Sequence, residues 1–289
     1  MEYDATDILP GKATSDMRQE APLVQWTYNV SKEDLQTLWE TCFPEDATGF
    51  ARFFLDQYYV PSQAVCVLNP DGSTVESALY WLPCTYRIDG RMGRFLYIYA
   101  MGTHPDYRRR GNLRAMLDFV QQYCLQQGID GMVLRAMPAS KSSVETFDMQ
   151  PKLTLCGALR TGLDKRADDW CTGAFEDFKR LRMDYLDTLP GCIYWEEREL
   201  RFVYEDLCQN DKLFFFREAS QLHYAIVTRT ETGICIEETD CESGVLQRLS
   251  GAVTFYRPGN GLYGAHIKTY AKSLQGQDLC KLYFNLMLQ

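Results

Sequence analysis

A basic, glycine-containing segment lies between a strand-like and a helix-like stretch, and this feature most constrains the fold. Phe95–Thr103 is apolar and aromatic, which predicts a buried strand. After a turn at 104–107 come three arginines and Gly111, and apolar residues then repeat at helical spacing from Leu113 to Cys124. The sequence therefore predicts a strand, a tight basic loop and a helix in direct succession.

This succession suits a pyrophosphate group. The first free N–H groups of a helix point outward and carry partial positive charge. Gly111 has no Cβ and lets a ligand approach the backbone, while the arginines before it offer forked, charged donors. We expect the ligand contacts to lie in one continuous stretch: Arg108, Arg109, Arg110, Gly111, Asn112, Leu113 and Arg114. A solvated helix start without a ligand is the alternative interpretation.

Composition limits the class of protein. The chain has 289 residues, 46% of them hydrophobic, so it can bury a large core and is long enough for two domains. The net charge of −9 argues against general nucleic-acid binding, which needs a broad basic face. No apolar run is long enough to span a membrane, and the N-terminus lacks the pattern of a secretory signal. We therefore expect a cytoplasmic protein without a membrane or nucleic-acid partner.

The cysteines do not follow a metal-binding or disulfide pattern. The chain has 11 cysteines, an odd number, and only 3 histidines, and no two cysteines are spaced as Cys-x-x-Cys. Free buried thiols in a reducing compartment are therefore the preferred interpretation, and a metal site is not expected.

The first half of the chain predicts alternating helices and strands. The strong turn Asn69–Gly72 indicates a hairpin, Ser31 suits the start of a helix, and Gly128 suits the end of one. The expected elements are a strand over 24–30, helices from Ser31 and over 48–58, hairpin strands over 64–68 and 76–82, the strand Phe95–Thr103, a helix over 109–127, a strand over 131–136 and a short helix over 140–150. Residues 156–170 look irregular.

The second half predicts the same order of elements. Helices are expected over 175–186 and 196–208, strands over 212–217, 224–230 and 233–238, a short helix over 245–249 and a strand over 252–256. We interpret this as a duplication of topology without a repeat of sequence. The expected organisation is an N-terminal segment over 1–20, a domain over 21–170 and a second domain over 171–289. The fold class is α/β with a mixed sheet.

With this order of elements, the stretch from Met101 to Arg114 resembles the GNAT superfamily of acyl-CoA-dependent N-acyltransferases. In that family a strand ends in a bulged segment whose backbone pairs with the pantetheine arm, and the following loop holds the pyrophosphate. Arg108 matches the first position of the loop and Gly111 its invariant glycine, whereas Leu113 departs from the usual Gly or Ala. The resemblance implies a GNAT fold and acetyl-CoA as co-substrate.

The resemblance also implies contacts to the pantetheine arm and an arrangement of two domains. The backbone from Met101 through Gly102 to Thr103 would hold the arm and polarise the thioester carbonyl. The two halves together resemble tandem-GNAT bacterial acetyltransferases of the enhanced intracellular survival type. In the second half Thr239–Gly244 is acidic where the first half is basic, so it is not expected to bind acyl-CoA.

The catalytic groups are less clear from the sequence. The family commonly uses a tyrosine as acid after the strand over 131–136, but Phe147 stands at that place. Candidates for proton transfer are Glu76, Tyr97 and Tyr99, with an exposed carboxylate and core phenols as the respective alternatives. In tandem relatives the terminal carboxylate can enter the first domain's site, which adds Gln289 as a further candidate.

The expected function is transfer of an acetyl group to a primary amine of a small molecule or peptide, by direct attack in a ternary complex. Acidic and aromatic residues suit a cationic amine as the acceptor. The alternative is a catalytically inactive, acyl-CoA-binding regulatory or interaction protein, which Phe147 in place of a tyrosine keeps open. Assembly into a homo-oligomer is also left open.

Overall fold

The computed structural model describes residues 22–46, 48–135, 150–162, 170–230, 233–249, 251–258, 262–275, 277–279 and 282–284. Its helices are α1 (Lys32–Cys42), α2 (Phe50–Gln57), α3 (Asn112–Gln127), α5 (Phe175–Asp187), α6 (Glu197–Gln209) and α7 (Glu242–Leu246), with 3-10 turns η1 (Thr27–Asn29), η2 (Pro61–Gln63), η3 (Pro105–Tyr107) and η5 (Lys272–Leu274). The strands are β1 (Val24–Trp26), β2 (Ala64–Leu68), β3 (Val75–Ile88), β4 (Arg91–Thr103), β5 (Gly131–Leu134), β6 (Gln150–Gly162), β7 (Trp170–Cys171), β8 (Gly191–Trp195), β9 (Leu213–Glu218), β10 (Gln221–Thr230), β11 (Gly233–Thr239), β12 (Gly251–Pro258) and β13 (Leu262–Thr269).

The first half has the predicted order of elements. Strands β2, β3 and β4 are antiparallel neighbours, and α3 carries the chain from β4 to the parallel strand β5. The hydroxyl of Ser31 accepts a hydrogen bond from the N–H of Asp34 at 3.0 Å, which starts α1, and Gly128 ends α3 with a φ of 62°. The strand expected over 24–30 ends earlier, because Thr27–Asn29 turns into η1.

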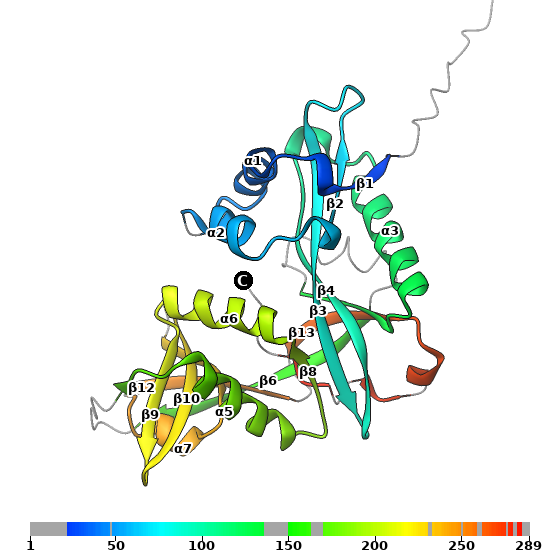
Figure 1. Cartoon of the computed structure of the whole chain (residues 1–289). Coiled ribbons are helices and arrows are strands. Elements are labelled where there is room, and N and C mark those ends of the chain that lie inside the picture. Colours follow the sequence, from blue (N-terminus) through cyan, green and yellow to red (C-terminus); the bar gives the residue numbers. More distant parts are fainter. Residues whose placement is uncertain are drawn as a thin grey trace, which may run out of the picture.

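Strands β3 and β4 are longer than the sequence indicates. The expected hairpin strand over 76–82 stops before Pro83, a residue that cannot donate a hydrogen bond to a ladder. The strand nevertheless continues to Ile88, and its far end pairs with β8, with Cys84 opposite Trp195. This ribbon reaches across to the second half of the chain (Figure 1).

The two faces of this sheet carry different layers. Leu96 and Ile98 of β4 pack with Met116 and Val120 of α3, whereas Tyr97 and Tyr99 point to the opposite face. There the tyrosines join a core with α1, α2 and α6, so the predicted alternation along this strand is confirmed. Figure 1 shows α1 and α2 on one side of the sheet, α3 on the other, and α6 just below α2.

The second half repeats this topology, as the sequence predicted. Strands β9, β10 and β11 are antiparallel neighbours, and α7 leads from β11 to the parallel strand β12. The short helix starts at Glu242, three residues before the expected position, because the chain turns directly after β11. The mixed α/β fold class is therefore confirmed, with a second group of strands in the same order as the first.

The two halves exchange strands, which the sequence did not indicate. Strand β6 belongs to the first half in sequence but pairs with β12, while β13 from the end of the chain pairs with β5. These two strands also pair with each other, so the strands form one continuous hydrogen-bonded sheet. The expectation that residues 156–162 are irregular was wrong, and the division at residue 170 stays a prediction. The short helix was expected over 140–150; residues 140–149 lie outside the described residues, and Gln150 begins β6 instead.

A buried ion pair fixes the last described residues to the second half. The guanidinium of Arg182 donates from Nε to Oε1 of Glu238 at 2.9 Å, and both side chains are buried. The hydroxyls of Tyr224 and Tyr283 donate to the same carboxylate at 2.8 and 3.0 Å. Tyr283 therefore stays in place, and the next residue, Phe284, packs on Tyr97 with ring centroids 5.4 Å apart.

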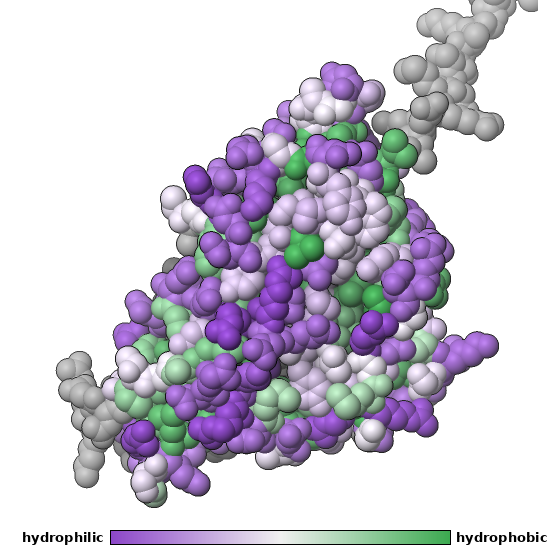
Figure 2. Space-filling view, in the orientation of Figure 1, coloured by the Kyte–Doolittle hydropathy of each residue, from purple (hydrophilic) through white to green (hydrophobic). Residues whose placement is uncertain are grey.

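Hydrophilic side chains dominate the face in Figure 2, and hydrophobic ones form small separate patches. Within the described ranges no helix is long and apolar enough to cross a membrane. The cysteines whose side chains are described are free thiols. The expectation of buried thiols holds only in part, because Cys171 and Cys208 are exposed.

Candidate active site

Strand β4 carries a bulge close to its end. Ala78 pairs with Gly102 and Tyr80 pairs with Tyr99, so two residues of β4, Ala100 and Met101, stand against one residue of β3. Ala100 has a φ of 44°, which is unusual for a residue with a side chain. Such strain recurs at binding sites, because the bulge turns backbone groups away from the ladder. The bulge lies where the resemblance places the contact to the thioester carbonyl.

Strands β4 and β5 separate before this bulge. Their parallel pairing runs from Phe95 opposite Gly131 to Tyr97 opposite Val133, yet β4 continues to Thr103. Among the described residues the last part of β4 thus has no partner on that side. An unpaired strand edge of this kind can pair with an extended ligand.

The basic loop has the geometry that suits an anion. Gly111 caps α3 with a φ of 86°, and the first N–H that bonds within the helix is that of Ala115, which donates to Gly111 O at 3.0 Å. The N–H groups of Asn112 and Leu113 come before this bond, where an α-helix leaves its N–H groups outside its own hydrogen-bond ladder. A Cβ at Gly111 would meet nothing within 4 Å, so the space beside it is open. The helix begins three residues after the predicted start because the glycine adopts the left-handed conformation.

The arginines of the loop are exposed and partly held by backbone oxygens. Arg108 donates from Nε to Thr103 O at 3.2 Å, and Arg110 donates from Nη2 to Asp106 O at 3.2 Å. The guanidinium of Arg110 also lies 4.8 Å from the ring centroid of Tyr107. These contacts keep positive charge beside the helix start.

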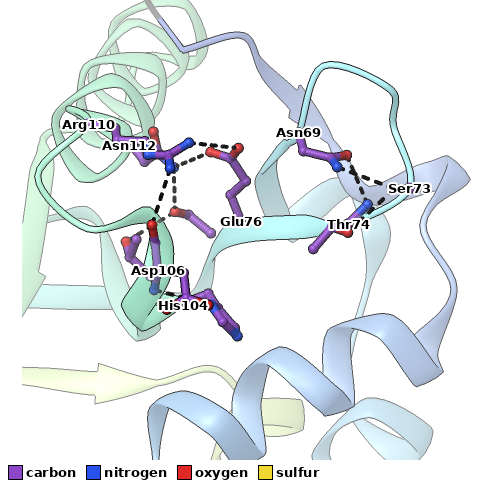
Figure 3. A network of polar contacts seen from close by, with 10 residues as sticks. Asn69, Ser73, Thr74, Glu76, His104, Asp106, Arg110 and Asn112 are labelled. Atoms are coloured by element: carbon purple, nitrogen blue, oxygen red, sulfur yellow. Dashed lines mark hydrogen bonds and ion pairs between the residues drawn. The ribbon is translucent and has the colours of Figure 1, made fainter.

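Behind the loop, Glu76 and Asn112 form a buried hydrogen-bonded pair (Figure 3). The side-chain amide of Asn112 donates to Oε2 of Glu76 at 2.9 Å and to Oγ of Ser77 at 3.0 Å. Glu76 also lies 3.9 Å from Nη1 of Arg110. The side chain of Asn112 faces inward, so only its backbone is placed to meet a ligand. The alternative that Glu76 is exposed was wrong, and its described contacts are with the loop.

A small pocket lies beside the bulge, on the face covered by α1. Its walls come from α1, β3 and β4 and comprise Leu38, Trp39, Cys42, Phe43, Ala78, Tyr80, Ala100 and Gly102. The hydroxyl of Tyr80 is buried and has no hydrogen-bond partner in the part of the chain that the structure describes. A buried polar group without a partner costs free energy unless a ligand or water satisfies it. Tyr80, whose hydroxyl has no described partner, is thus one of the residues that line the pocket beside the strained backbone.

The candidate phenols on β4 remain protonated at neutral pH. Burial raises the pKa of Tyr99 well above its usual value, and the carboxylates of Asp206 and Asp46 raise it further. Burial likewise raises the pKa of Tyr97. Each phenol can therefore donate a hydrogen bond or a proton, but it is a poor base.

The structure adds Asp206 to the candidate residues. It lies on the buried side of α6, and burial raises its pKa to about 6, with a partly compensating effect of Lys212. The side-chain amide of Asn210 donates to its Oδ1 at 2.9 Å. The signal in the sequence was an acidic residue three positions after Val203, within the apolar face of the helix. Its charge acts on Tyr99 from the second half of the chain.

Two residues of the sequence argument fall outside the described ranges. Neither Phe147 nor Gln289 is described, so the missing tyrosine and the terminal carboxylate stay predictions. The last described residue, Phe284, contacts both Tyr97 and Trp195.

The fold is shared by solved structures at low sequence identity. Residues 30–147 match the profile of the acetyltransferase (GNAT) domain. A GCN5-related N-acetyltransferase from Kribbella flavida superposes with a TM-score of 0.59 at 14% identity, over 86% of this chain and 70% of that one. A conserved protein of unknown function from Enterococcus faecalis, described as a probable N-acyltransferase, gives 0.63 at 13% identity over 86% and 70%. Eis1 from Mycobacterium abscessus gives 0.59 at 11% identity over 81% and 65%. No curated protein matches the chain.

The bulged strand, its separation from β5 and the glycine-capped loop are the features of an acyl-CoA-dependent N-acyltransferase fold. Residues 30–147 thus match the acetyltransferase (GNAT) domain, and the chain shares its fold with the N-acetyltransferase structures.

Proposed function

We propose that the protein transfers an acetyl group from acetyl-CoA to a primary amine of a small molecule or a peptide, by direct attack in a ternary complex. The observation that carries this proposal is the succession of the Ala100 bulge and the Gly111 loop on one strand and its following helix. The loop binds the pyrophosphate, and the bulged backbone binds the pantetheine arm and the thioester carbonyl.

The neutral amine nitrogen attacks the thioester carbon, the C–S bond breaks, and the CoA thiolate leaves and takes up a proton. A backbone N–H at Met101 stabilises the negative charge on the carbonyl oxygen. Tyr80 or Tyr99 supplies the proton or hydrogen bond for the thiolate, because both phenols are buried and protonated.

Asp206 is our candidate for accepting the proton of the amine. A carboxylate with a pKa of about 6 is ionised at pH 7.5, yet is a stronger base than an ordinary aspartate. Its charge and that of Asp46 lie near the Tyr99 phenol, where they favour a cationic acceptor. We assign Glu76 a positioning role, because its described partners are Asn112 and Arg110. The Gln289 carboxylate remains an alternative base.

Calorimetric titration of acetyl-CoA and of free CoA into the wild type and into Gly111→Trp tests the loop. We expect binding in the micromolar range to the wild type and at least a tenfold loss in the variant. Gly49→Trp is a matched control, because Gly49 caps α2 with a φ of 85° and likewise has nothing within 4 Å of a Cβ. Equal losses in both variants would show that the effect is backbone strain and would contradict the assignment.

An acceptor screen that detects free CoA thiol tests the reaction. Steady thiol release with an amine supports transfer. The Asp206→Asn variant should have a lower kcat/KM, and the rise in kcat/KM near pH 6 should be absent from its pH profile. Acetyl-CoA binding without thiol release for any amine would favour the non-catalytic alternative. No acetyl-CoA binding at all would refute the co-substrate assignment.

A further inference from the structure

Three residues of metal-binding type converge at one end of the second half's sheet. A ligand atom from each of Glu218, His223 and Cys241 lies within 4.8 Å of the other two. Glu218 ends β9, His223 lies on the neighbouring β10, and Cys241 follows β11, two residues beyond the pair of Ala225 and Thr239. The three side chains therefore come from three adjacent strands, and the strand register brings them together.

The backbone around these residues is tightly constrained. Ala219 and Ser220 have φ values of 46° and 70°, which form the tight turn that brings Glu218 close to β10. Gly244 of α7 passes so close that a Cβ there would lie 2.8 Å from Oε2 of Glu218 and 3.0 Å from Sγ of Cys241. Because no side chain stands at this position, the carboxylate and the thiol can meet, with Sγ donating to Oε2 at 2.8 Å.

The histidine also contacts a carboxylate that is not one of the three residues. Nδ1 of His223 lies 3.1 Å from Oδ2 of Asp240, and the other oxygen of Asp240 accepts a hydrogen bond from the N–H of Tyr224 at 3.0 Å. When Nδ1 carries the proton and donates to Asp240, Nε2 keeps its lone pair. Histidines that bind metals are commonly oriented by a carboxylate in this way.

We propose that Glu218, His223 and Cys241 bind a zinc ion, with water as the fourth ligand. Thiolate, imidazole and carboxylate are the ligands that zinc takes in tetrahedral sites, and separations below 4.8 Å need only small adjustments to reach it. All three residues are half-buried, so an ion can reach them from solvent. Binding releases the thiol proton of Cys241 to solvent.

This site explains a difference between the two halves. Cys241 caps α7, and α7 follows the third antiparallel strand of its half just as α3 follows β4. The first half places arginines there, whereas the second places a thiol and carboxylates. A metal was not expected from the sequence, which has no Cys-x-x-Cys pair, because these three ligands are separated by 5 and 18 positions along the chain.

The test is titration of CoCl2 and ZnSO4 into the full-length, untagged, reduced and metal-free protein. We expect the visible bands of tetrahedral cobalt, a thiolate-to-cobalt charge-transfer band, and displacement of cobalt by one equivalent of zinc. Cys241→Ser should remove the charge-transfer band. His223→Gln should weaken zinc binding at least tenfold in competition with a chromophoric chelator, and Asp240→Asn about 10- to 100-fold.

Cys208→Ser is the control, because Cys208 is an exposed thiol on α6, away from the cluster. Zinc should raise the thermal unfolding midpoint of the wild type and of this control, but not that of Cys241→Ser. Absence of a cobalt spectrum in the wild type would overturn the proposal. So would a charge-transfer band or a zinc-induced thermal shift that persists unchanged in Cys241→Ser.

Discussion

The buried carboxylate of Asp206 makes the stability of the protein depend on pH in an unusual direction. Its folded-state pKa of about 6 stands about two units above that of an unfolded aspartate. Between these two values the folded protein binds more protons than the unfolded chain, so the free energy of unfolding falls as the pH rises. Each pKa unit corresponds to about 1.4 kcal/mol, so the loss is about 3 kcal/mol in all and is complete above about pH 7.

Asp206→Asn removes this titration and keeps the shape of the side chain. The carbonyl oxygen of the new amide can still accept the hydrogen bond that Asn210 donates. We expect the variant to gain stability relative to the wild type as the pH rises, by about 2 kcal/mol between pH 4 and pH 7.5, because the unfolded aspartate is already half ionised at pH 4. The change in stability between the two pH values is the quantity to compare, because a buried amide adds its own free-energy cost equally at every pH.

Urea unfolding at half-unit intervals between pH 4 and pH 8 measures the effect. Asp118→Asn is a control with the same change in charge at an exposed position of α3. The difference in the free energy of unfolding between Asp118→Asn and the wild type should vary by less than about 0.5 kcal/mol from pH 4 to pH 8. If Asp206→Asn and the wild type show the same pH dependence, the reasoning from burial is wrong.

Three further substitutions test other contacts. Asn112→Ala leaves the buried Glu76 without its amide partner, so we expect a loss of about 1–3 kcal/mol in urea unfolding and weaker acetyl-CoA binding by calorimetry; unchanged binding would separate the pair from the loop. Glu238→Gln strips the charge partner from the buried Arg182 and should cost about 3–5 kcal/mol, and a loss below about 1 kcal/mol would contradict the role of that ion pair. Gly102→Ala places a Cβ 2.9 Å from Cys42, so overpacking should lower stability by about 1–3 kcal/mol and a neutral result would show that α1 moves freely.

The fold could be predicted where signals are local. The hairpin turn at Asn69–Gly72, the cap at Ser31 and the left-handed Gly128 each act through neighbouring backbone atoms, and each is confirmed. Strands β6, β8 and β13 were missed, because what makes them strands is pairing with residues far away in the chain.

In the candidate site, too, local features could be predicted from the sequence and long-range contacts could not. The loop around Gly111 is a local motif, and the structure gives it the predicted conformation. The buried contact of Glu76 with Asn112 joins residues 36 positions apart, and Asp206 acts on Tyr99 from another half of the chain. Periodicity shows that such side chains are buried, but it does not show what they meet.

The exchange of β6 and β13 has a consequence for how the protein is made. Strand β5 ends at Leu134, but its neighbour β13 begins only at Leu262, about 130 residues later. At about 5–20 residues per second the ribosome needs roughly 6–26 seconds to supply that strand. During this interval the nascent acetyltransferase domain has an open sheet edge at β5, a surface that invites pairing with other chains. The β5 edge therefore stays open for longer during synthesis than the edge of a domain that closes its own sheet.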